Sequence, residues 1–279
     1  MEAQPKCNLI IDSCCDLPFE VIDRPGVQLL EFPYIDEKGE HSDDLYRTIT
    51  PHEFYEGMRE GSQPSTAQVP VTVFQDVFSK AIESGVPTVY LSFTSGLSGS
   101  FNTAVMMRDQ LIAEHPEAEL YVVDTYLASV AEALLVYEAL GQRDNGMTAR
   151  ELAAWAEEAR YFVDAEFMVD DLESLRRGGR IPSTVAYAGA KLDVKPLLNI
   201  SIEGKLALTG VARGRKKGIK QLAEYYNKRK ADSRPGRCVV IGNADCPKDA
   251  ARLKELLAKE DDNLLFLESS IGPVIGSHV

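Results

Sequence analysis

The segment SFTSGLSGSFNTA, Ser92–Ala104, combines hydroxyl side chains with two glycines and contains no charged residue. Glycines let backbone N–H groups approach a ligand closely, and hydroxyls can donate hydrogen bonds to an anion. The segment lies between an expected strand and an expected helix, whose N-terminus adds a partial positive charge. Such a loop suits a phosphate or a carboxylate. The same residue types would also serve as a helix cap and a tight turn.

Two further segments supply candidate ligand residues. The uncharged run QPSTAQVP, Gln63–Pro70, places Thr66 shortly before another expected helix. The segment SSIGPVIGSHV supplies His278, one of four histidines. A single histidine in such a segment is more often incidental than functional, so a role for His278 depends on the residues that surround it in the fold.

Nucleophilic catalysis and metal binding have little support in the sequence. A serine such as Ser95 or Ser98 would need a histidine base and an orienting carboxylate, and no histidine lies in such a pattern. The GxSxG, Walker and GxGxxG patterns are absent. No His, Cys or carboxylate group has the spacing of metal ligands. We therefore expect neither a metal nor a cofactor.

The charge balance limits the partners of the chain. Thirty Lys and Arg against 43 Asp and Glu give the 279 residues a net charge of −13. A protein this acidic is repelled by nucleic acid and by anionic membranes unless its basic residues are clustered. One cluster, Arg213–Lys220, is typical of a solvated helix start or a protein-docking patch. We expect no nucleic-acid partner and at most transient contact with a membrane.

Cysteine usage and the distribution of apolar residues indicate the compartment. The five cysteines are irregularly spaced and form no CxxC pair, which argues against a disulfide framework. The N-terminal segment MEAQPKCNLIID does not resemble a signal peptide, and no apolar run approaches ~18 residues. These features predict a soluble cytoplasmic protein.

The order of expected elements predicts the fold class. Up to about residue 160, strands alternate with helices, which is typical of a parallel sheet covered by helices on both faces. These strands are expected at residues 7–12, 27–35, 87–93 and 118–124. Further on, LDVKPLLNISIEGKLALTG predicts an antiparallel hairpin that turns at Glu203-Gly204. We predict a two-domain α/β fold: an N-terminal domain, 1–160, and a smaller C-terminal domain, 161–279, with a mixed or antiparallel sheet that closes over the ligand.

Six segments together resemble the DegV family, fatty-acid-binding proteins of bacterial lipid metabolism. In chain order they are IIDSCCDLP, PSTAQVP, TSGLSGSFNTA, DLESLRRGGRI, LDVKPLLNISIEGKL with VARGRKKGIKQL, and IGPVIGSHV. Each motif alone is weak. Their common order over essentially the whole chain makes the resemblance strong.

The resemblance implies one long-chain, palmitate-like fatty acid bound between two domains. It implies that Thr66 and Ser98 hold the carboxylate, with Ser95 as a second choice in the same loop. His278 would complete this polar end. Arg180 and Arg213 are implied as contacts for the carboxylate or for a partner. The family's function further implies a separate fatty acid kinase that makes the acyl phosphate, while the binding protein itself does no chemistry.

A physical hypothesis connects the uncharged loops to such a ligand. Burying ~14 methylenes at ~0.8 kcal/mol each supplies on the order of 11 kcal/mol of gross driving force. The carboxylate then needs orientation more than attraction, and neutral hydroxyls provide it without a buried ion pair. Two alternatives remain. One is an enzyme that acts on a small phosphorylated or carbonyl substrate at the same loop, and the other is an interaction module that uses the Arg213–Lys220 face.

Overall fold

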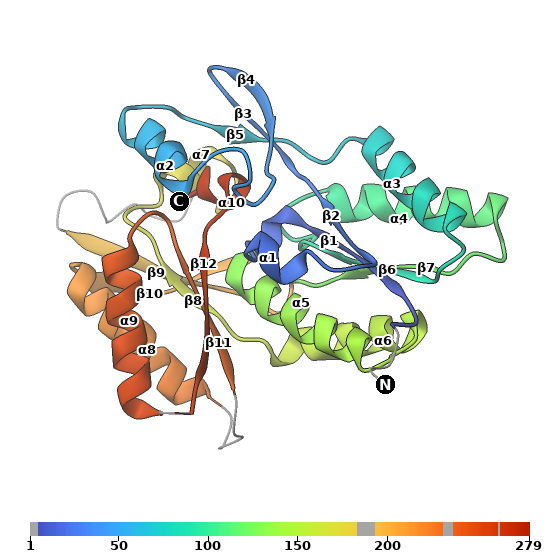
Figure 1. Cartoon of the computed structure of the whole chain (residues 1–279). Coiled ribbons are helices and arrows are strands. Elements are labelled where there is room, and N and C mark those ends of the chain that lie inside the picture. The colour runs from blue at the N-terminus through green and yellow to red at the C-terminus, as the bar shows by residue number, and fades with distance from the viewer. Residues whose placement is uncertain (1–4, 183–192, 231–236, 262) are drawn as a thin grey trace.

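The computed structural model describes residues 5–182, 193–230, 237–261 and 263–279. Its largest sheet is parallel, with the strand order β2-β1-β6-β7 (Figure 1). The strands are β1 (Asn8–Asp12), β2 (Val27–Leu30), β6 (Thr88–Ser92) and β7 (Leu120–Asp124). Every residue of β6 is buried, as expected for an apolar run in the centre of a parallel sheet. The predicted parallel sheet is confirmed.

Helices cover both faces of this sheet. Alternate residues of a strand point to opposite faces, so Ile10 and Tyr90 pack on one side while Leu9 and Val89 pack on the other. The first side is covered by α3 (Val71–Glu83) and α4 (Ser100–Glu114), and the second by α5 (Ser129–Asp144) and α6 (Ala149–Ala159) (Figure 1). Two buried clusters of apolar residues therefore fix the sheet between two layers of helices.

The predicted strand at residues 27–35 is wrong, because the chain forms two strands there. After β2, the backbone N–H of Phe32 donates to Ser13 Oγ at 3.1 Å instead of extending the parallel ladder. Pro33, which has no N–H, then begins β3 (Pro33–Asp36). This strand belongs to a separate antiparallel sheet with β4 (Gly39–Ser42) and β5 (Ser65–Thr66).

The remaining residues form a smaller α/β part with two sheets. One is antiparallel, with β8 (Glu166–Met168), β9 (Val194–Ile200) and β10 (Leu206–Arg213); the other is the parallel pair β11 (Cys238–Asn243) and β12 (Leu265–Ser270). The predicted hairpin is confirmed, since β9 and β10 pair on either side of the turn at Glu203-Gly204. The helices of this part are α7 (Glu173–Arg177), α8 (Arg215–Arg229), α9 (Pro247–Glu260) and α10 (Pro273–Gly276).

Short helices complete the chain: η1 (Ser13–Cys15), α1 (Phe19–Ile22), α2 (Pro51–Arg59) and η2 (Arg160–Phe162). The helix α2 begins with a capping box, in which Thr50 Oγ1 accepts from Glu53 N and the Glu53 carboxylate accepts from Thr50 N. The two-part α/β fold class is confirmed, whereas the boundary at residue 160 stays a prediction. Among the described residues, no helix is long and apolar enough to cross a membrane.

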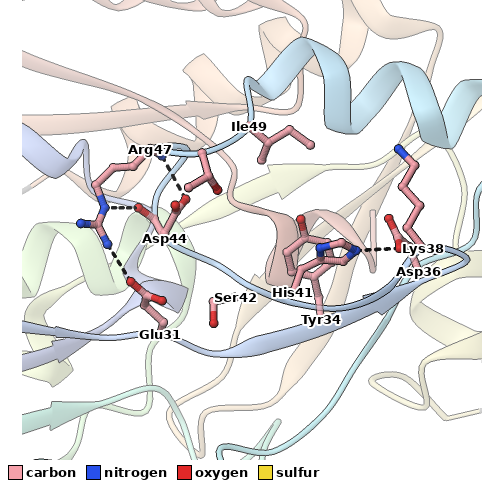
Figure 2. A pocket seen from close by; sticks show the side chains of 10 residues that line it. Glu31, Tyr34, Asp36, Lys38, His41, Ser42, Asp44, Arg47 and Ile49 are labelled. Atoms are coloured by element: carbon pink, nitrogen blue, oxygen red, sulfur yellow. Dashed lines mark hydrogen bonds and ion pairs between the residues drawn. The ribbon is translucent and has the colours of Figure 1, made fainter.

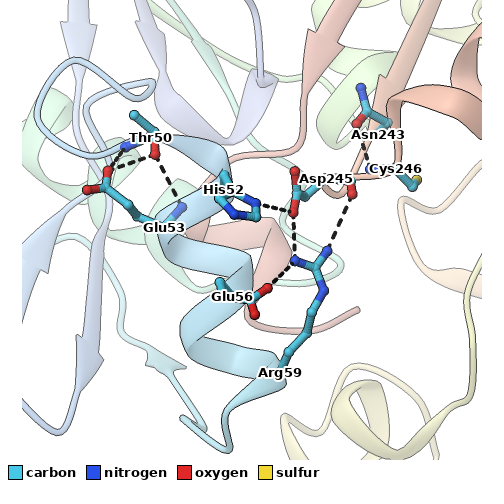
Figure 3. A network of polar contacts seen from close by, with 8 residues as sticks. All are labelled: Thr50, His52, Glu53, Glu56, Arg59, Asn243, Asp245 and Cys246. Carbon is cyan, nitrogen blue, oxygen red and sulfur yellow. Dashed lines mark hydrogen bonds and ion pairs between the residues drawn. The ribbon is translucent and has the colours of Figure 1, made fainter.

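The helix α2 contacts the segment that follows β11. The carboxylate of Asp245 lies 2.7 Å from Arg59 Nη1 and 3.0 Å from His52 Nδ1 (Figure 3). Arg59 also pairs with Glu56 one turn earlier in the same helix. These side chains join the N-terminal part of the chain to the C-terminal part at an exposed edge.

Candidate functional site

The polar pair Thr66 and His278 forms the centre of the candidate site. Thr66 Oγ1 lies 2.9 Å from His278 Nε2, although the two residues are 212 positions apart. The two-residue strand β5 places Thr66 opposite Tyr34 of β3. The turn after α10 places His278 at the same point. Two residues that belonged to separate motifs in the sequence are thus brought into direct contact.

The His278 ring is largely enclosed. Its Nδ1 atom is buried and has no hydrogen-bond partner in the described part of the chain. A Cβ atom at Gly178 would overlap this nitrogen, so the ring lies directly against the backbone after α7. Burial, together with the nearby cations Arg180 and Arg177, lowers the pKa of His278 to about 4. The imidazole is therefore neutral at pH 7 and offers one donor and one acceptor.

Arg180 lies beside this pair, whereas Arg213 does not contact it. The Arg180 guanidinium donates to the carbonyl of Gly178, and burial lowers the pKa of Arg180. Arg213 is the last residue of β10, pairs with Val194 and is exposed. Within the described ranges, no hydrogen bond or ion pair links Arg213 to Thr66 or His278.

Ser98 lies at the start of α4, close to the segment that carries Thr66. Its hydroxyl donates to Ser100 Oγ at 3.0 Å and accepts from Ser100 N at 3.2 Å. Ser100 Oγ in turn accepts from Val69 N at 3.2 Å. A Cβ atom at Gly99 would lie 2.6 Å from Gln68 Oε1. The two uncharged runs are therefore adjacent, and the Ser98 hydroxyl accepts from the amide of the first residue of α4.

The rest of the hydroxyl-rich loop contacts the hairpin turn of the C-terminal part. Thr94 Oγ1 donates to Gly204 O at 3.0 Å, and Gly96 N donates to Thr94 Oγ1 at 3.0 Å. Ser95 contributes its backbone, because Ser95 N donates to Asp124 Oδ1 at 3.1 Å. Thr94 was not among the predicted site residues, although it belongs to the same hydroxyl-rich segment. The loop is thus held between both parts of the chain.

The opening motif IIDSCCDLP holds the start of this loop. Asp12 is fully buried and accepts from Phe93 N at 2.7 Å, from Tyr90 Oη at 2.9 Å and from Cys14 N at 3.1 Å. Burial raises the pKa of Asp12 to about 7. Asp16 accepts from Gly272 N at 2.9 Å, shortly before His278. Both carboxylates belong to the motif, but nothing in the sequence indicated a role for them in the site.

Two surface cavities lie elsewhere on the N-terminal part. The larger, about 510 Å³, lies around β3 and β4 (Figure 2), and neither Thr66, Ser98 nor His278 lines it. In it, His41 stacks on Tyr34 with ring centroids 5.1 Å apart, and His41 Nε2 lies 2.8 Å from Asp36. The smaller, about 290 Å³, adjoins it and shares the ion pair of Arg47 and Glu31.

Metal ligands are not gathered at the site. Within residues 5–182, 193–230, 237–261 and 263–279, no group of three or more His, Cys, Asp or Glu residues is arranged to hold a metal ion. The group that meets Thr66 is the neutral imidazole of His278, the Arg180 guanidinium lies beside that imidazole, and the hydroxyl-rich loop lies beside the segment that carries Thr66. This combination can hold an oxyanion by hydrogen bonds.

Comparison with known proteins identifies the family. The model of the family described as "Uncharacterised protein, DegV family COG1307" matches residues 6–279. The chain belongs to the DegV family. It is 34% identical to a DegV domain-containing protein of Clostridium perfringens, over 98% of this chain and 94% of that protein. The resemblance inferred from the sequence motifs is confirmed.

Solved structures of DegV proteins share the fold. A protein of Thermotoga maritima, described as revealing a fatty acid binding function, is 27% identical with a TM-score of 0.82, covering 99% of this chain and 96% of that one. A fatty-acid-binding DegV family protein of Thermus thermophilus is 28% identical with a TM-score of 0.81, covering 98% of this chain and 95% of that one. These two relatives are thus described as binding proteins for fatty acids.

Proposed function

We propose that this protein binds a long-chain fatty acid between its two parts and presents the acid to a separate fatty acid kinase. The observation that carries this proposal is the contact between Thr66 and His278, whose Nδ1 atom is buried without a partner among the described residues. Fatty acid binding by two relatives of the same fold supports it. The carboxylate lies at Thr66, His278 and Ser98, with Ser95 in the adjoining turn.

The protonation of the pair suits a carboxylate. When Nε2 carries the imidazole proton, the ring donates to Thr66 Oγ1 and leaves the threonine hydrogen free for the ligand. When Nδ1 carries it, Thr66 donates to the ring, and the Nδ1 proton is enclosed against the backbone of Gly178. The first tautomer is therefore the one that leaves a donor of the pair, the Thr66 hydroxyl, for an oxyanion. Arg180, half-buried beside His278, adds a positive charge that favours the ionised acid.

The alkyl chain supplies most of the affinity. Each buried methylene contributes about 0.8 kcal/mol, whereas each hydrogen bond to a charged group contributes about 1.5–3 kcal/mol. A head group held mainly by neutral donors is therefore sufficient. It also leaves the carboxylate available to a phosphoryl donor, which a tightly enclosed ion pair would obstruct. In this scheme the exposed Arg213, followed by the basic start of α8, faces the kinase.

The decisive experiment extracts the purified protein with organic solvent and identifies bound acids by mass spectrometry. We expect C14–C18 fatty acids in stoichiometric amount. A lipid-free protein that binds a phosphorylated metabolite instead would contradict the proposal and favour an enzyme acting at the same loop.

The head-group residues are tested by a fatty acid titration of the Thr66→Ala, Ser98→Ala double variant. We expect the dissociation constant to rise about tenfold to a hundredfold. Thr209→Ala is a matched control, because this hydroxyl bonds to Glu166 in the β8–β10 sheet. Unchanged binding by the double variant would remove both residues from the site. Phosphoryl transfer from ATP to the bound acid, in the presence of a bacterial fatty acid kinase, tests the presentation step.

A further inference from the structure

The backbone segment that leads to His278 is held by buried and partly buried groups from the N-terminal part of the chain. Four side chains contact residues 271–274: two carboxylates, Asp16 and Asp43, and two phenols, Tyr46 and Tyr55. They come from the opening motif, from the loop after β4 and from α2. We call these four residues the tail socket.

The two carboxylates bind two backbone amides at the start of α10, those of its N-cap Gly272 and of Val274. Asp16 Oδ1 accepts from Gly272 N at 2.9 Å, and Asp43 Oδ2 accepts from Val274 N at 3.1 Å. Both carboxylates are buried, with 1% and 0% of their surface exposed. A Cβ atom at Gly272 would lie 2.8 Å from an oxygen of each, so only glycine fits between them. The backbone amides of Gly272 and Val274 are thus held in place by two buried side chains, Asp16 and Asp43.

The two phenols bind the carbonyl that precedes these amides. Tyr46 Oη donates to Ile271 O at 2.6 Å, and Tyr55 Oη donates to the same oxygen at 2.8 Å. A carbonyl oxygen has two lone pairs, so these donors satisfy it completely. A Cβ atom at Gly276 would lie 2.5 Å from Tyr55 Oη, which places this ring directly against α10 as well.

The anchored segment is connected to His278 by a single helical turn. Gly276 N donates to Gly272 O at 2.7 Å, and Ser277 Oγ donates to Pro273 O at 2.7 Å. His278 N then donates to Ile275 O at 3.0 Å. Because this turn is internally hydrogen-bonded, fixing residues 271–274 also fixes the direction in which the imidazole points.

We propose that the tail socket positions His278, holding its imidazole against Thr66 so that the head-group site exists before a ligand arrives. The four socket residues act through the backbone of residues 271–274 and have no direct contact with the ligand. The biological meaning of this inference rests on the proposed fatty acid site. The arrangement also gives the aspartates of the opening motif a role: Asp12 holds the hydroxyl-rich loop, and Asp16 holds the segment that carries the histidine.

A first test removes the phenol hydroxyls and keeps the rings. In the Tyr46→Phe, Tyr55→Phe double variant, Ile271 O loses both donors, whereas Tyr121→Phe, whose hydroxyl bonds to the surface residue Glu119, is the matched control. The readout is the titration of His278 followed by nitrogen-15 NMR of the imidazole ring. We expect the low pKa of His278 to rise towards the ordinary value of about 6.5 in the double variant only.

A second test uses the left-handed backbone of Asp16, which has a φ of 52°. Asparagine and glycine both tolerate this conformation, but only asparagine keeps an oxygen that can accept from Gly272 N. Asp16→Asn should therefore retain the wild-type signals of His278, and Asp16→Gly should lose them. We expect the fatty acid dissociation constant to rise about tenfold for Asp16→Gly and to change little for Asp16→Asn.

The two proposals fail in different ways. If His278 keeps its low pKa and its ring signals in the folded Tyr46→Phe, Tyr55→Phe variant, the positioning role is wrong whatever the protein binds. If the wild-type protein binds no fatty acid, the proposed function is wrong, and the NMR titration still decides whether the socket places His278. Should Asp16→Gly fail to fold, the phenylalanine variant, which keeps both rings, decides the positioning role by itself.

Discussion

The hydroxyl of Thr94 donates to the carbonyl of Gly204 at 3.0 Å, and this bond joins the hydroxyl-rich loop of the N-terminal part to the hairpin turn of the C-terminal part. Gly204 has a φ of 71°, and a Cβ atom there would overlap Thr94 Oγ1. The turn can therefore approach the loop this closely only through a glycine.

Replacing Gly204 by alanine should disturb the junction. We expect Gly204→Ala to lower the free energy of unfolding by about 1–3 kcal/mol, since it adds backbone strain and a steric clash. Gly141→Ala is the control, because Gly141 lies in α5 with open space around it and should gain about 0.5–1 kcal/mol. Urea denaturation measures both. Equal changes in the free energy of unfolding for Gly204→Ala and Gly141→Ala would contradict the close approach of Gly204 to Thr94.

Gly178 should be required for the placement of His278. Its backbone is right-handed, with a φ of −72°, so Gly178→Ala introduces no backbone strain, and its methyl group would overlap the imidazole while lying 3.3 Å from Ser174 O. We expect fatty acid affinity to fall about tenfold while unfolding changes by less than about 1 kcal/mol. Gly57→Ala, in α2 with nothing near it, is the matched change. A normal affinity for Gly178→Ala would place the ligand away from the ring.

Glu132 should reduce stability as the pH rises. It is fully buried in α5, neither carboxyl oxygen has a hydrogen-bond partner among the residues described, and burial raises its pKa well above the usual value. The unfolded chain releases this proton near pH 4.5, whereas the folded chain retains it, so stability is lost as the pH rises above that value. Glu132→Gln cannot ionise, so its free energy of unfolding should increase relative to that of the wild type between about pH 5 and pH 8.

The measurement for Glu132→Gln is urea denaturation at both pH values. Glu138→Gln is the control, because Glu138 is exposed in the same helix. A constant difference between Glu132→Gln and the wild type across this pH range would mean that the buried carboxyl does not keep its proton.

The charged contact at α2 should contribute little to stability. Arg59 and His52 are 47% and 72% exposed where they meet Asp245, and exposed ion pairs contribute about 0–1 kcal/mol. Asp245→Asn keeps an acceptor and tolerates the φ of 53° at this position. We expect Asp245→Asn to lower the free energy of unfolding, measured by urea denaturation, by less than about 1 kcal/mol, and we expect this difference to disappear in about 1 M salt. A larger, salt-independent loss would show that this contact does more than bridge an exposed edge.

Much of the fold could be predicted from local pattern. The apolar runs that became β1, β6 and β7 indicated a buried parallel sheet, and Thr50 with Glu53 marked the start of α2. The strand expected at 27–35 failed because apolar residues continue across two different sheets. The change of sheet depends on the bond from Phe32 N to Ser13 Oγ, which no local pattern reveals.

The site was less accessible to sequence reasoning. Hydroxyls and glycines indicated an anion loop, but the pairing of Thr66 with His278 came from family resemblance, because their contact spans 212 positions. Asp43, Tyr46 and Tyr55 carried no recognisable motif at all. Their roles depend on tertiary contacts with residues 271–274, and a buried carboxylate that accepts a distant amide looks like any other aspartate in the sequence.

The distance along the chain between Thr66 and His278 has a consequence for biosynthesis. During translation, Thr66 leaves the ribosome long before residue 278 is added. The growing chain therefore contains Thr66 without His278 for most of its synthesis. The contact between Thr66 and His278 therefore forms only after both residues have been synthesised, and the proposed head-group site cannot be complete before then.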